Sequence, residues 1–273
     1  MKRKDIVNIP KIGKEPRGTN NKYWIKDKGI NKLVKYNSDI YPDLDVMESL
    51  ASDILKKIKI DCVNVELGYN SDIKQNCCII DSFLLKDCEV LYEIDIDWPE
   101  REIKDINREI EMSFGRVFGI FYKLCSEEEL KQLIKQYIRK TLGDIIIGNE
   151  DGKLKNTGLI FNEETHRYRL TPNFDNGLAF HSYIFGQSNE PICYIGNQGF
   201  TSNEVLTYIL NNKYDDVSDI IDSFNDFMEN DYIQLIDTYQ PVLEPQKYHY
   251  IIKHLDWIKY NIDTLLPKNH KAR

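Results

Sequence analysis

The stretch that decides the fold runs from Ile147 to Phe180. It begins I-G-N-E-D-G-K-L-K-N-T-G-L-I-F at residue 147 and, after a polar turn, continues R-L-T-P-N-F-D-N-G-L from residue 169. Each side of the expected hairpin carries one acidic and one amide side chain: Asp151 with Asn156, and Asp175 with Asn176. Carboxylate and amide oxygens at the ends of buried strands are typical ligands of a hard cation such as Mg²⁺. The stretch therefore predicts a cation site built on a hairpin.

Asp151, Lys153 and Asn156 have the spacing D-x-K-x-x-N. In phosphoryl transfer a carboxylate accepts the proton of the attacking hydroxyl, an amide a few residues later binds Mg²⁺, and a lysine between them neutralises the transferring phosphate. The alternative is an Asp-Gly turn between a helix and a strand, with solvated lysines. The second cluster favours the first interpretation, because Asp175 follows an apolar run and precedes Asn-Gly, so its carboxylate can point back into a cleft. Asp175 could also be a simple turn residue, since Asp before Asn-Gly is common in turns.

Length and composition limit the classes of protein to which the chain can belong. A chain of 273 residues allows one large domain or two lobes, and 41% hydrophobic with 29% charged residues predicts a substantial core. The net charge is −8 and no stretch collects enough Lys and Arg for direct nucleic-acid binding. The basic start of the chain is not followed by the apolar segment of a signal peptide, and no apolar run reaches the length of a membrane span. We expect a cytoplasmic protein with no membrane partner.

The first 86 residues predict a mostly β region with one helix. Residues 23–26 and 31–36 alternate in polarity around the turn signal Asp-Lys-Gly, and the second of these strands contains Lys35. Helical spacing over residues 45–57, with Asp45 as the expected N-cap, places Glu48 on the first helical turn. Further strands are expected at 62–67 and 76–84, joined by a turn at 68–71.

The rest of the chain is expected to be mainly helical outside the hairpin. The strongest signal is residues 126–147, where Ser126 and Glu129 have capping-box spacing and apolar residues recur at helical intervals. A Gly-, Ser- and Asn-rich loop is expected at 186–203. The other expected helices cover residues 99–118, 202–212, 215–229, 231–238 and 245–264.

The order of these motifs resembles the HipA-like serine/threonine kinase family, in its compact, CtkA-like form with a single kinase domain. The resemblance extends from about Gly18 to Leu178 and is most specific at 148–159 and 171–177. The motifs that carry it are G-T-N-N-K-Y-W at residue 18, L-V-K-Y at 33, V-M-E-S-L-A at 46, I-I-D-S-F-L at 79, and the two clusters quoted above. At Lys153 the family usually has His or another residue, so this loop looks more like that of ordinary protein kinases.

The resemblance implies a role for each matching residue. Lys35 matches the strand lysine that contacts the α- and β-phosphates of ATP, and Glu48 matches the helix glutamate that orients this lysine. Asp151 matches the catalytic base, beside Lys153, while Asn156 and Asp175 match the Mg²⁺ ligands. The phosphate-covering loop would be Gly18, Thr19, Asn20, Asn21 and Lys22, and the hinge that binds adenine would be Asp81, Ser82 and Phe83. We expect Lys35 to be partly exposed, so that its loss weakens nucleotide binding with little loss of stability.

The resemblance implies an α+β, bilobal, protein-kinase-like fold. A small β-rich N-lobe would cover residues 1–86 and a larger helical C-lobe residues 87–273. The implied reaction is Mg²⁺-dependent transfer of the ATP γ-phosphate to a Ser or Thr hydroxyl of a protein, with a toxin–antitoxin system and an antitoxin partner as one setting. Two alternatives stay open: a kinase that acts on small molecules or lipids, because the fold does not determine the acceptor, and a nucleotide-binding pseudokinase that acts as an interaction module.

Overall fold

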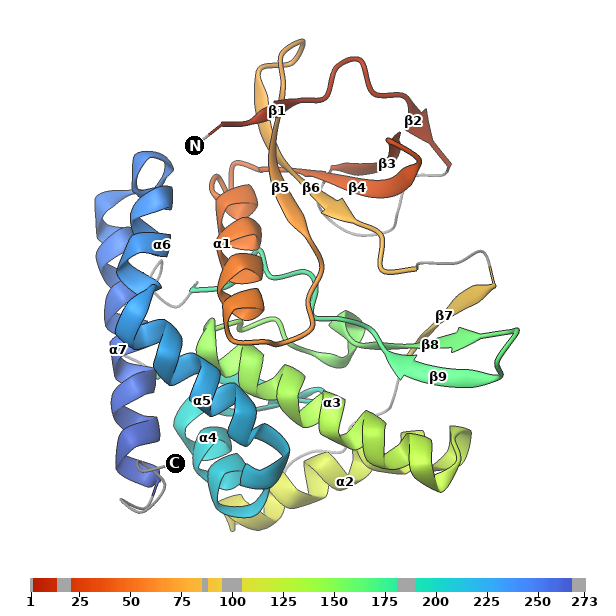
Figure 1. Cartoon of the computed structure of the whole chain (residues 1–273), viewed down its shortest axis with the longest axis vertical. Helices are drawn as coiled ribbons and strands as arrows, with labels where there is room; N and C mark the ends of the chain where they lie inside the picture. The colour runs from red at the N-terminus through yellow and green to blue at the C-terminus, as the bar shows by residue number, and fades with distance from the viewer. Residues whose placement is uncertain (1, 14–20, 85–87, 95–104, 181–189, 267–273) are drawn as a thin grey trace.

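The computed structural model describes residues 2–13, 21–84, 88–94, 105–180 and 190–266, and shows a mixed α+β fold (Figure 1). A curled sheet of six strands in the order β1-β5-β6-β4-β3-β2 forms the upper part of the view. Its strands are β1 (Lys4–Asp5), β2 (Lys11–Ile12), β3 (Lys22–Asp27), β4 (Ile30–Tyr36), β5 (Val65–Asn70) and β6 (Gln75–Asp81). All neighbouring strands are antiparallel except β1 and β5, which are parallel.

The hairpin of β3 and β4 is the one predicted from the sequence. Its turn residues Lys28 and Gly29 have φ angles of 52° and 86°, the left-handed conformation that a tight type I′ turn requires. In the register of the two strands Lys22 lies opposite Lys35. Because side chains alternate along a strand, Lys35 points to the face opposite that of Val34, which is fully buried in the sheet's own core.

Helix α1 (Leu44–Lys57) covers one face of β5 and β6 (Figure 1). The helix lies where the sequence predicted it, but the predicted N-cap is wrong. The residue that caps the helix is Asp43, without a side-chain hydrogen bond. Asp45 lies inside the first turn with no exposed surface, and its carboxylate accepts a hydrogen bond of 2.6 Å from Asn37 Nδ2. The Asp45 carboxylate therefore binds a buried residue of a neighbouring loop and does not cap the helix.

Six further helices form the lower and left parts of Figure 1 within the described residues. They are α2 (Ile106–Leu124), α3 (Glu127–Ile146), α4 (Ser202–Asn212), α5 (Tyr214–Asn230), α6 (Tyr232–Tyr239) and α7 (Pro245–Leu265). The capping box predicted for α3 is confirmed, since Ser126 Oγ accepts from Glu129 N while Glu129 accepts from Ser126 N. Helix α2 begins later than predicted, and residues 95–104 lie outside the described residues.

A three-stranded sheet, β7-β8-β9, contains the predicted hairpin as β8 (Gly158–Asn162) and β9 (Arg167–Leu170), with β7 (Glu89–Glu93) beside it. The prediction of an irregular loop over 186–203 is wrong where the structure describes it. Residues 192–201 form a second hairpin, β10 (Ile192–Ile195) and β11 (Gln198–Thr201). Strands of four residues are too short to show a periodic pattern, although Gly196-Asn197 at the turn is a hairpin signal. The turn predicted at 68–71 is also misplaced, because β5 continues to Asn70.

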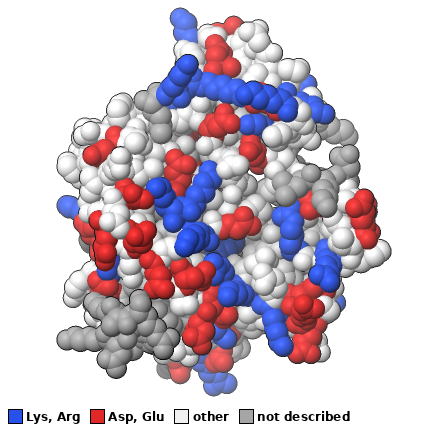
Figure 2. Space-filling view, in the orientation of Figure 1, with Lys and Arg blue, Asp and Glu red and all other residues white. Residues whose placement is uncertain are grey.

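The main hydrophobic core lies among the helices and includes the apolar side of α1, whereas the six-stranded sheet has small separate cores. On the face drawn in Figure 2, acidic and basic side chains are interspersed, with acidic residues gathered over α5. This helix carries Asp215, Asp216, Asp219, Asp222, Asp226 and Glu229. Among the described residues no helix combines the length and apolar character needed to cross a membrane.

Candidate active site

Lys35, Glu48 and Asp175 meet although they come from β4, α1 and the segment after β9. Lys35 Nζ lies 2.6 Å from Glu48 Oε1 and also contacts the Asp175 carboxylate. Lys35 is only 5% exposed and Glu48 is fully buried, so the expectation of a partly exposed lysine is wrong. The lysine is buried because α1 and the Asp175 segment close over its face of the sheet.

Opposite charges decide the protonation states of these three groups. Burial by itself lowers the pKa of Lys35, but the Glu48 and Asp175 carboxylates outweigh it and hold this pKa above its ordinary value. Burial acts to raise the pKa of Asp175, yet the Lys35 ammonium holds it below its usual range, helped by Lys22 and Lys155. Burial also raises the pKa of Glu48, against the pull of Lys35. Lys35 and Asp175 are thus both charged at neutral pH, and three lysines surround the Asp175 carboxylate.

The segment around Asp175 has an unusual backbone conformation. Asp175 has a φ of 60°, a left-handed conformation that Asp tolerates better than most residues. Two residues later, a Cβ on Gly177 would lie 2.8 Å from Leu44 Cγ at the start of α1, so only glycine allows this close approach. Before it, the Phe174 ring packs against Phe83 with centroids 5.0 Å apart. The segment is therefore fixed on both sides, and the Asp175 side chain keeps 38% of its surface exposed.

The loop after α3 places Asp151 and Asn156 side by side. Asn156 Nδ2 donates to the Asp151 carbonyl at 2.7 Å and to Asp151 Oδ2 at 3.4 Å. A short 3₁₀ turn, Leu154–Asn156, brings the amide back toward the aspartate. Gly152 permits the tight path of this loop, because a Cβ there would lie 2.7 Å from Asp144 Oδ2. The D-x-K-x-x-N spacing thus corresponds to one compact polar loop.

The two lysines of this loop point to different partners. Lys153 Nζ lies 4.8 Å from the centre of the Tyr194 ring on β10, a cation–π contact. Lys155 Nζ lies 2.9 Å from Asp151 Oδ2, and its charge also lowers the pKa of Asp175. The sequence reasoning singled out Lys153 and passed over Lys155. Lys153 and Lys155 lie two residues apart in a short loop, where no periodic pattern shows which side chain faces which partner.

A buried polar network supports the loop from behind, and the sequence reasoning did not identify it. Asp144 is 3% exposed and accepts hydrogen bonds from Lys140 Nζ at 2.7 Å, Asn149 Nδ2 at 3.1 Å and Asn173 Nδ2 at 3.3 Å. The spacing of four residues between Lys140 and Asp144 on the apolar end of α3 was the available signal. A buried carboxylate with a cation and two amides is satisfied, so the network can hold both polar segments in place.

A chain of hydrogen bonds joins the two halves of the site. Asn176 N donates to Glu48 Oε2 at 2.8 Å, and Asn149 Nδ2 donates to Asn176 Oδ1 at 3.3 Å. Asn149 Oδ1 in turn accepts from Asp151 N at 3.1 Å. Asn149 and Asn176 are both buried. The backbone at Asp151 is therefore positioned relative to the Lys35–Glu48 pair through two amide side chains.

A cavity of about 1080 Å³ lies at the end of β6. Its lining includes Asp81, Ser82 and Phe83, the residues predicted as a hinge, together with Trp24 and Lys26 of β3. Several hinge groups are already bonded within the protein. Asp81 N donates to the Asn64 carbonyl at 3.0 Å, Ser82 N to the Asn31 carbonyl at 3.0 Å, and the Phe83 carbonyl accepts from Arg169 at 2.7 Å. The predicted hinge therefore lines an open cavity, and neither Lys35 nor Asp175 is among the residues that line it.

The predicted phosphate-covering loop is described only at its end. Gly18, Thr19 and Asn20 lie outside the described residues. Lys22 begins β3 opposite Lys35, and burial lowers its pKa against the attraction of Asp175. The Asn21 carbonyl accepts from the backbone of β4 at 3.0 Å. Lys22, the last residue of the predicted loop, therefore lies within electrostatic reach of Lys35 and Asp175.

The donor set at Asn156 and Asp175 fits a magnesium ion that arrives with phosphates. Among the described residues there is no group of three or more His, Cys, Asp or Glu side chains arranged for a metal. Mg²⁺ is commonly held by one or two protein ligands, with phosphate oxygens and water completing its shell. Asp175 offers a charged, partly exposed carboxylate. Because Asn156 Nδ2 is bonded to Asp151, its amide oxygen is turned away from that aspartate.

Comparisons with known proteins identify the family and the fold of the chain. The sequence profile of the HipA-like C-terminal domain matches residues 14–199. The solved structure of CtkA, a proinflammatory kinase of Helicobacter pylori, superimposes with a TM-score of 0.70 at 16% identity, covering 97% of both chains. HipA of Shewanella oneidensis MR-1, solved with HipB and operator DNA, gives a TM-score of 0.53 at 14% identity, covering 90% of this chain and 65% of HipA. No curated protein matches the sequence.

Proposed function

The chain belongs to the HipA-like C-terminal domain family, and on that premise we propose that it is an ATP- and Mg²⁺-dependent serine/threonine protein kinase. The six-stranded sheet with α1, up to residue 86, would be the N-lobe, and residues 87–273 the helical C-lobe. The observation that carries the proposal is the convergence of Lys35, Glu48 and Asp175 next to the Asp151–Asn156 loop. Each charge needed for phosphoryl transfer is present there and has a hydrogen-bonded neighbour.

The nucleotide half of the site would bind ATP. Lys35, oriented by Glu48, would contact the α- and β-phosphates, and Lys22 with residues 18–21 would cover them. The cavity at the end of β6 would take the adenine, with the Ser82 carbonyl and the Phe83 N–H as its hydrogen-bond partners. Asn156 and Asp175 would hold Mg²⁺, which when bound neutralises charge on the phosphates.

The catalytic loop would act on the acceptor hydroxyl. Asp151 orients the Ser or Thr hydroxyl and accepts its proton as the oxygen bonds to the γ-phosphorus. The bond from this phosphorus to the β–γ bridging oxygen breaks, and ADP leaves. Lys155, beside Asp151, and Lys153, held over Tyr194, offset negative charge on the transferring group.

The proposal includes a protein partner and a setting. The Shewanella HipA was solved with HipB and operator DNA, and by analogy we propose an antitoxin-like protein partner for this chain in the cytoplasm. Direct nucleic-acid binding is not part of the proposal, because the chain has a net charge of −8. Purification of the tagged chain from its native host, followed by mass spectrometry of bound proteins, tests the partner.

Transfer of the γ-phosphate from radiolabelled ATP with Mg²⁺ tests the enzyme. The wild-type chain is expected to label itself or a protein substrate on Ser or Thr, while Asp151→Ala and Asp175→Ala do not. Phosphoamino-acid analysis separates this result from a kinase that acts on small molecules or lipids. A wild type that binds ATP but neither transfers nor hydrolyses it above the variants would be a pseudokinase and would overturn the proposal.

A further inference from the structure

The position of α1 decides whether the Lys35–Glu48 pair forms, because Glu48 lies on this helix. Moving a helix by one residue shifts its side chains by about 1.5 Å along the axis and about 100° around it. Either change would break the 2.6 Å contact between Lys35 Nζ and Glu48 Oε1. The contacts that hold α1 in register therefore determine whether Glu48 can reach Lys35.

Apolar packing ties α1 to the helical part of the molecule. Met47, Leu50 and Ile54 belong to the same hydrophobic core as Ile138 of α3 and Phe224 of α5. Strands β3 and β4 have a separate small core. Hydrophobic attraction is non-directional, so this packing keeps α1 against the helices without selecting one register.

Several directional contacts of α1 come from one stripe, while Asp45 at the start of the helix and Ser52, which donates to the Val63 carbonyl at 2.6 Å, make others. Ser49, Asp53 and Lys57 are spaced four residues apart and therefore share one face of the helix. Tyr239, the last residue of α6, places its hydroxyl 2.9 Å from Ser49 Oγ and 2.5 Å from Asp53 Oδ2. Lys57 Nζ lies 2.7 Å from Asp231 Oδ2, just before α6. The stripe connects α1 to α6 over two helical turns.

The contacts of this stripe differ in strength. Tyr239 is fully buried and bonded to two residues of α1. The Lys57–Asp231 pair is exposed, with 47% and 40% of the side-chain surfaces open, so solvent screens it. The bond from a fully buried hydroxyl to a carboxylate is the stronger of the two, although the Asp53 side chain is itself 36% exposed. Tyr239 is thus the main directional contact of the stripe.

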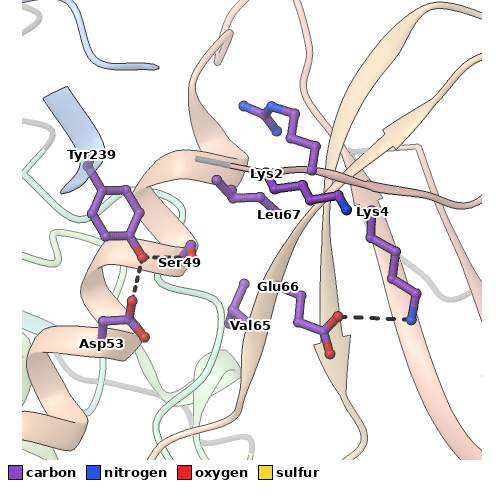
Figure 3. Close-up of a pocket in the computed structure, with 9 residues that line it drawn as sticks. Lys2, Lys4, Ser49, Asp53, Val65, Glu66, Leu67 and Tyr239 are labelled. Carbon is purple, nitrogen blue, oxygen red and sulfur yellow. Dashed lines mark hydrogen bonds and ion pairs between the residues drawn. The ribbon is translucent and has the colours of Figure 1, made fainter. Parts of the chain in front are cut away.

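A pocket of about 440 Å³ lies beside this contact. Figure 3 shows the Tyr239 hydroxyl directed at Ser49 and Asp53 on one side of the pocket, with Val65 and Leu67 of β5 on the other. The pocket leaves the Ser49–Asp53 side of α1 without tight packing against this end of the sheet. On this side of the helix, the hydrogen bonds of Tyr239 to Ser49 and Asp53 therefore add to the apolar packing of α1 against the sheet.

We propose that Tyr239 is a positioning residue that holds α1 in the register in which Glu48 reaches Lys35. The inference rests on the proposed function, in which this ion pair binds the phosphates of ATP. Tyr239 lies beyond residues 14–199, the part matched by the family profile. A helix outside that region would thus set the geometry of the nucleotide site.

The first test measures the ion pair without nucleotide. Lys35 is protected from acylation while buried and paired, because only the free amine reacts. Limited acetic anhydride labelling with peptide mass spectrometry is expected to show about fivefold faster labelling of Lys35 in Tyr239→Phe, with other lysines unchanged. Tyr248→Phe is the matched control: it removes a 2.5 Å bond from a tyrosine hydroxyl to Asp237 that does not involve α1. Equal Lys35 labelling in wild type, Tyr239→Phe and the control would overturn the proposal.

The second test uses kinetics and a double-mutant cycle. Tyr239→Phe is expected to raise KM for ATP and lower kcat, each by about fivefold, while Tyr248→Phe changes neither. Introduced into a Glu48→Gln chain, Tyr239→Phe should cause no further change, because it acts only through Glu48. An additional loss in the Glu48→Gln background would show a general structural role and overturn the proposal.

The two experiments separate the inference from the function on which it rests. If the wild type transfers no phosphate but Lys35 labelling responds to Tyr239→Phe, the positioning role stands and the kinase proposal fails. If the wild type is active and labelling does not respond, the kinase stands and the positioning role fails. Should Tyr239→Phe not fold, Ser49→Ala removes one of the same bonds from α1 and leaves the bond between Tyr239 and Asp53 in place, and the same outcomes apply to it.

Discussion

The two halves of the site are built in different ways. The nucleotide half joins Lys35, Glu48 and Asp175 across as many as 140 residues of sequence, and all but the Asp175 carboxylate are buried. The catalytic loop forms its Asp151–Asn156 contact within five residues, and the neighbouring Lys155 side chain is 62% exposed. One half is therefore assembled from distant segments of the core, while the other forms within one short loop that a buried network holds from behind.

Because of this difference, substitutions in the two halves should affect stability and activity to different extents. A charge buried with its partner cannot lose that partner without a large cost, since the remaining charge has no access to water. A carboxylate that keeps some access to water, such as Asp151, can be replaced by its amide with a smaller effect on folding. Substitutions in the nucleotide half should thus affect both properties, while Asp151 substitutions should affect activity far more than stability.

The largest effect is expected from Asp151→Asn. Loss of the proton acceptor should lower kcat by about 10⁴-fold, or about 5 kcal/mol in activation free energy. The free energy of unfolding should change by less than about 0.5 kcal/mol, because Asp151 is partly exposed. Steady-state kinetics and urea denaturation of the same preparation check both values. A matching loss of stability would mean that the catalytic loop is as much a part of the core as the nucleotide half.

Lys35→Met should lower the free energy of unfolding by about 4 kcal/mol, because it leaves the buried Glu48 without its cation. Adding Glu48→Leu to this variant should recover part of the loss, since the unpaired buried carboxylate is then removed as well. Urea denaturation of both variants measures this. A Lys35→Met chain as stable as wild type would contradict the contrast between the two halves.

A decrease in pH should lower the free energy of unfolding through His254 of α7, which lies against the end of α3 just before the catalytic loop. This buried imidazole bonds the carbonyls of Ile145 and Ile146 at 3.3 and 3.1 Å, at the end of α3, and burial lowers its pKa from 6.5 to about 4. The unfolded chain takes up this proton below pH 6.5 and the folded chain only near pH 4, so stability falls as the pH decreases between these values. The loss assigned to His254 is about 3 kcal/mol.

Thermal unfolding of wild type and His254→Gln between pH 7 and pH 4 measures this contribution. Other carboxyl groups titrate in both proteins, so the difference between the two curves isolates the histidine. The wild type should lose more stability than the variant over this interval. Parallel curves would show that His254 does not titrate as its buried position implies.

The smallest effect is expected from Lys57→Ala. Its pair with Asp231 is exposed on both sides, so the free energy of unfolding should change by less than about 0.5 kcal/mol. Urea denaturation at low and high salt is the measurement. A larger, salt-sensitive loss would mean that the exposed end of the α1 stripe contributes as much as its buried end at Tyr239.

Much of the fold could be predicted from local patterns. The hairpin of β3 and β4, the helices after residue 126 and the capping box of Ser126 follow from turn residues, apolar spacing and cap chemistry that act over a few positions. Errors occurred where these signals are weak. The hairpin at 192–201 has strands too short to be periodic, and Asp45 has the residue type of a cap but is used by a neighbouring loop.

The candidate site could likewise be predicted only where local patterns reveal it. Asp151, Asn156 and Asp175 could be proposed from the sequence because residue types and spacing within two short segments point to them. Asp144 and Asn149 were not, because their importance lies in contacts with segments that are distant in sequence or carry no motif. Lys35 was identified, but its burial was not, since exposure depends on what packs over a strand.

The sequence alone determined the order of elements, the family resemblance and the loop that would carry the chemistry, because each depends on residues close together in the chain. The tertiary structure decided that Lys35, Glu48 and Asp175 meet, that two buried amides connect them to Asp151, and that α1 is bonded to α6. These are contacts between distant segments, and they form only when the core brings those segments together. The stretch from Ile147 to Phe180 contains most of the residues proposed for the chemistry, and the fold brings Lys35 and Glu48 to Asp175.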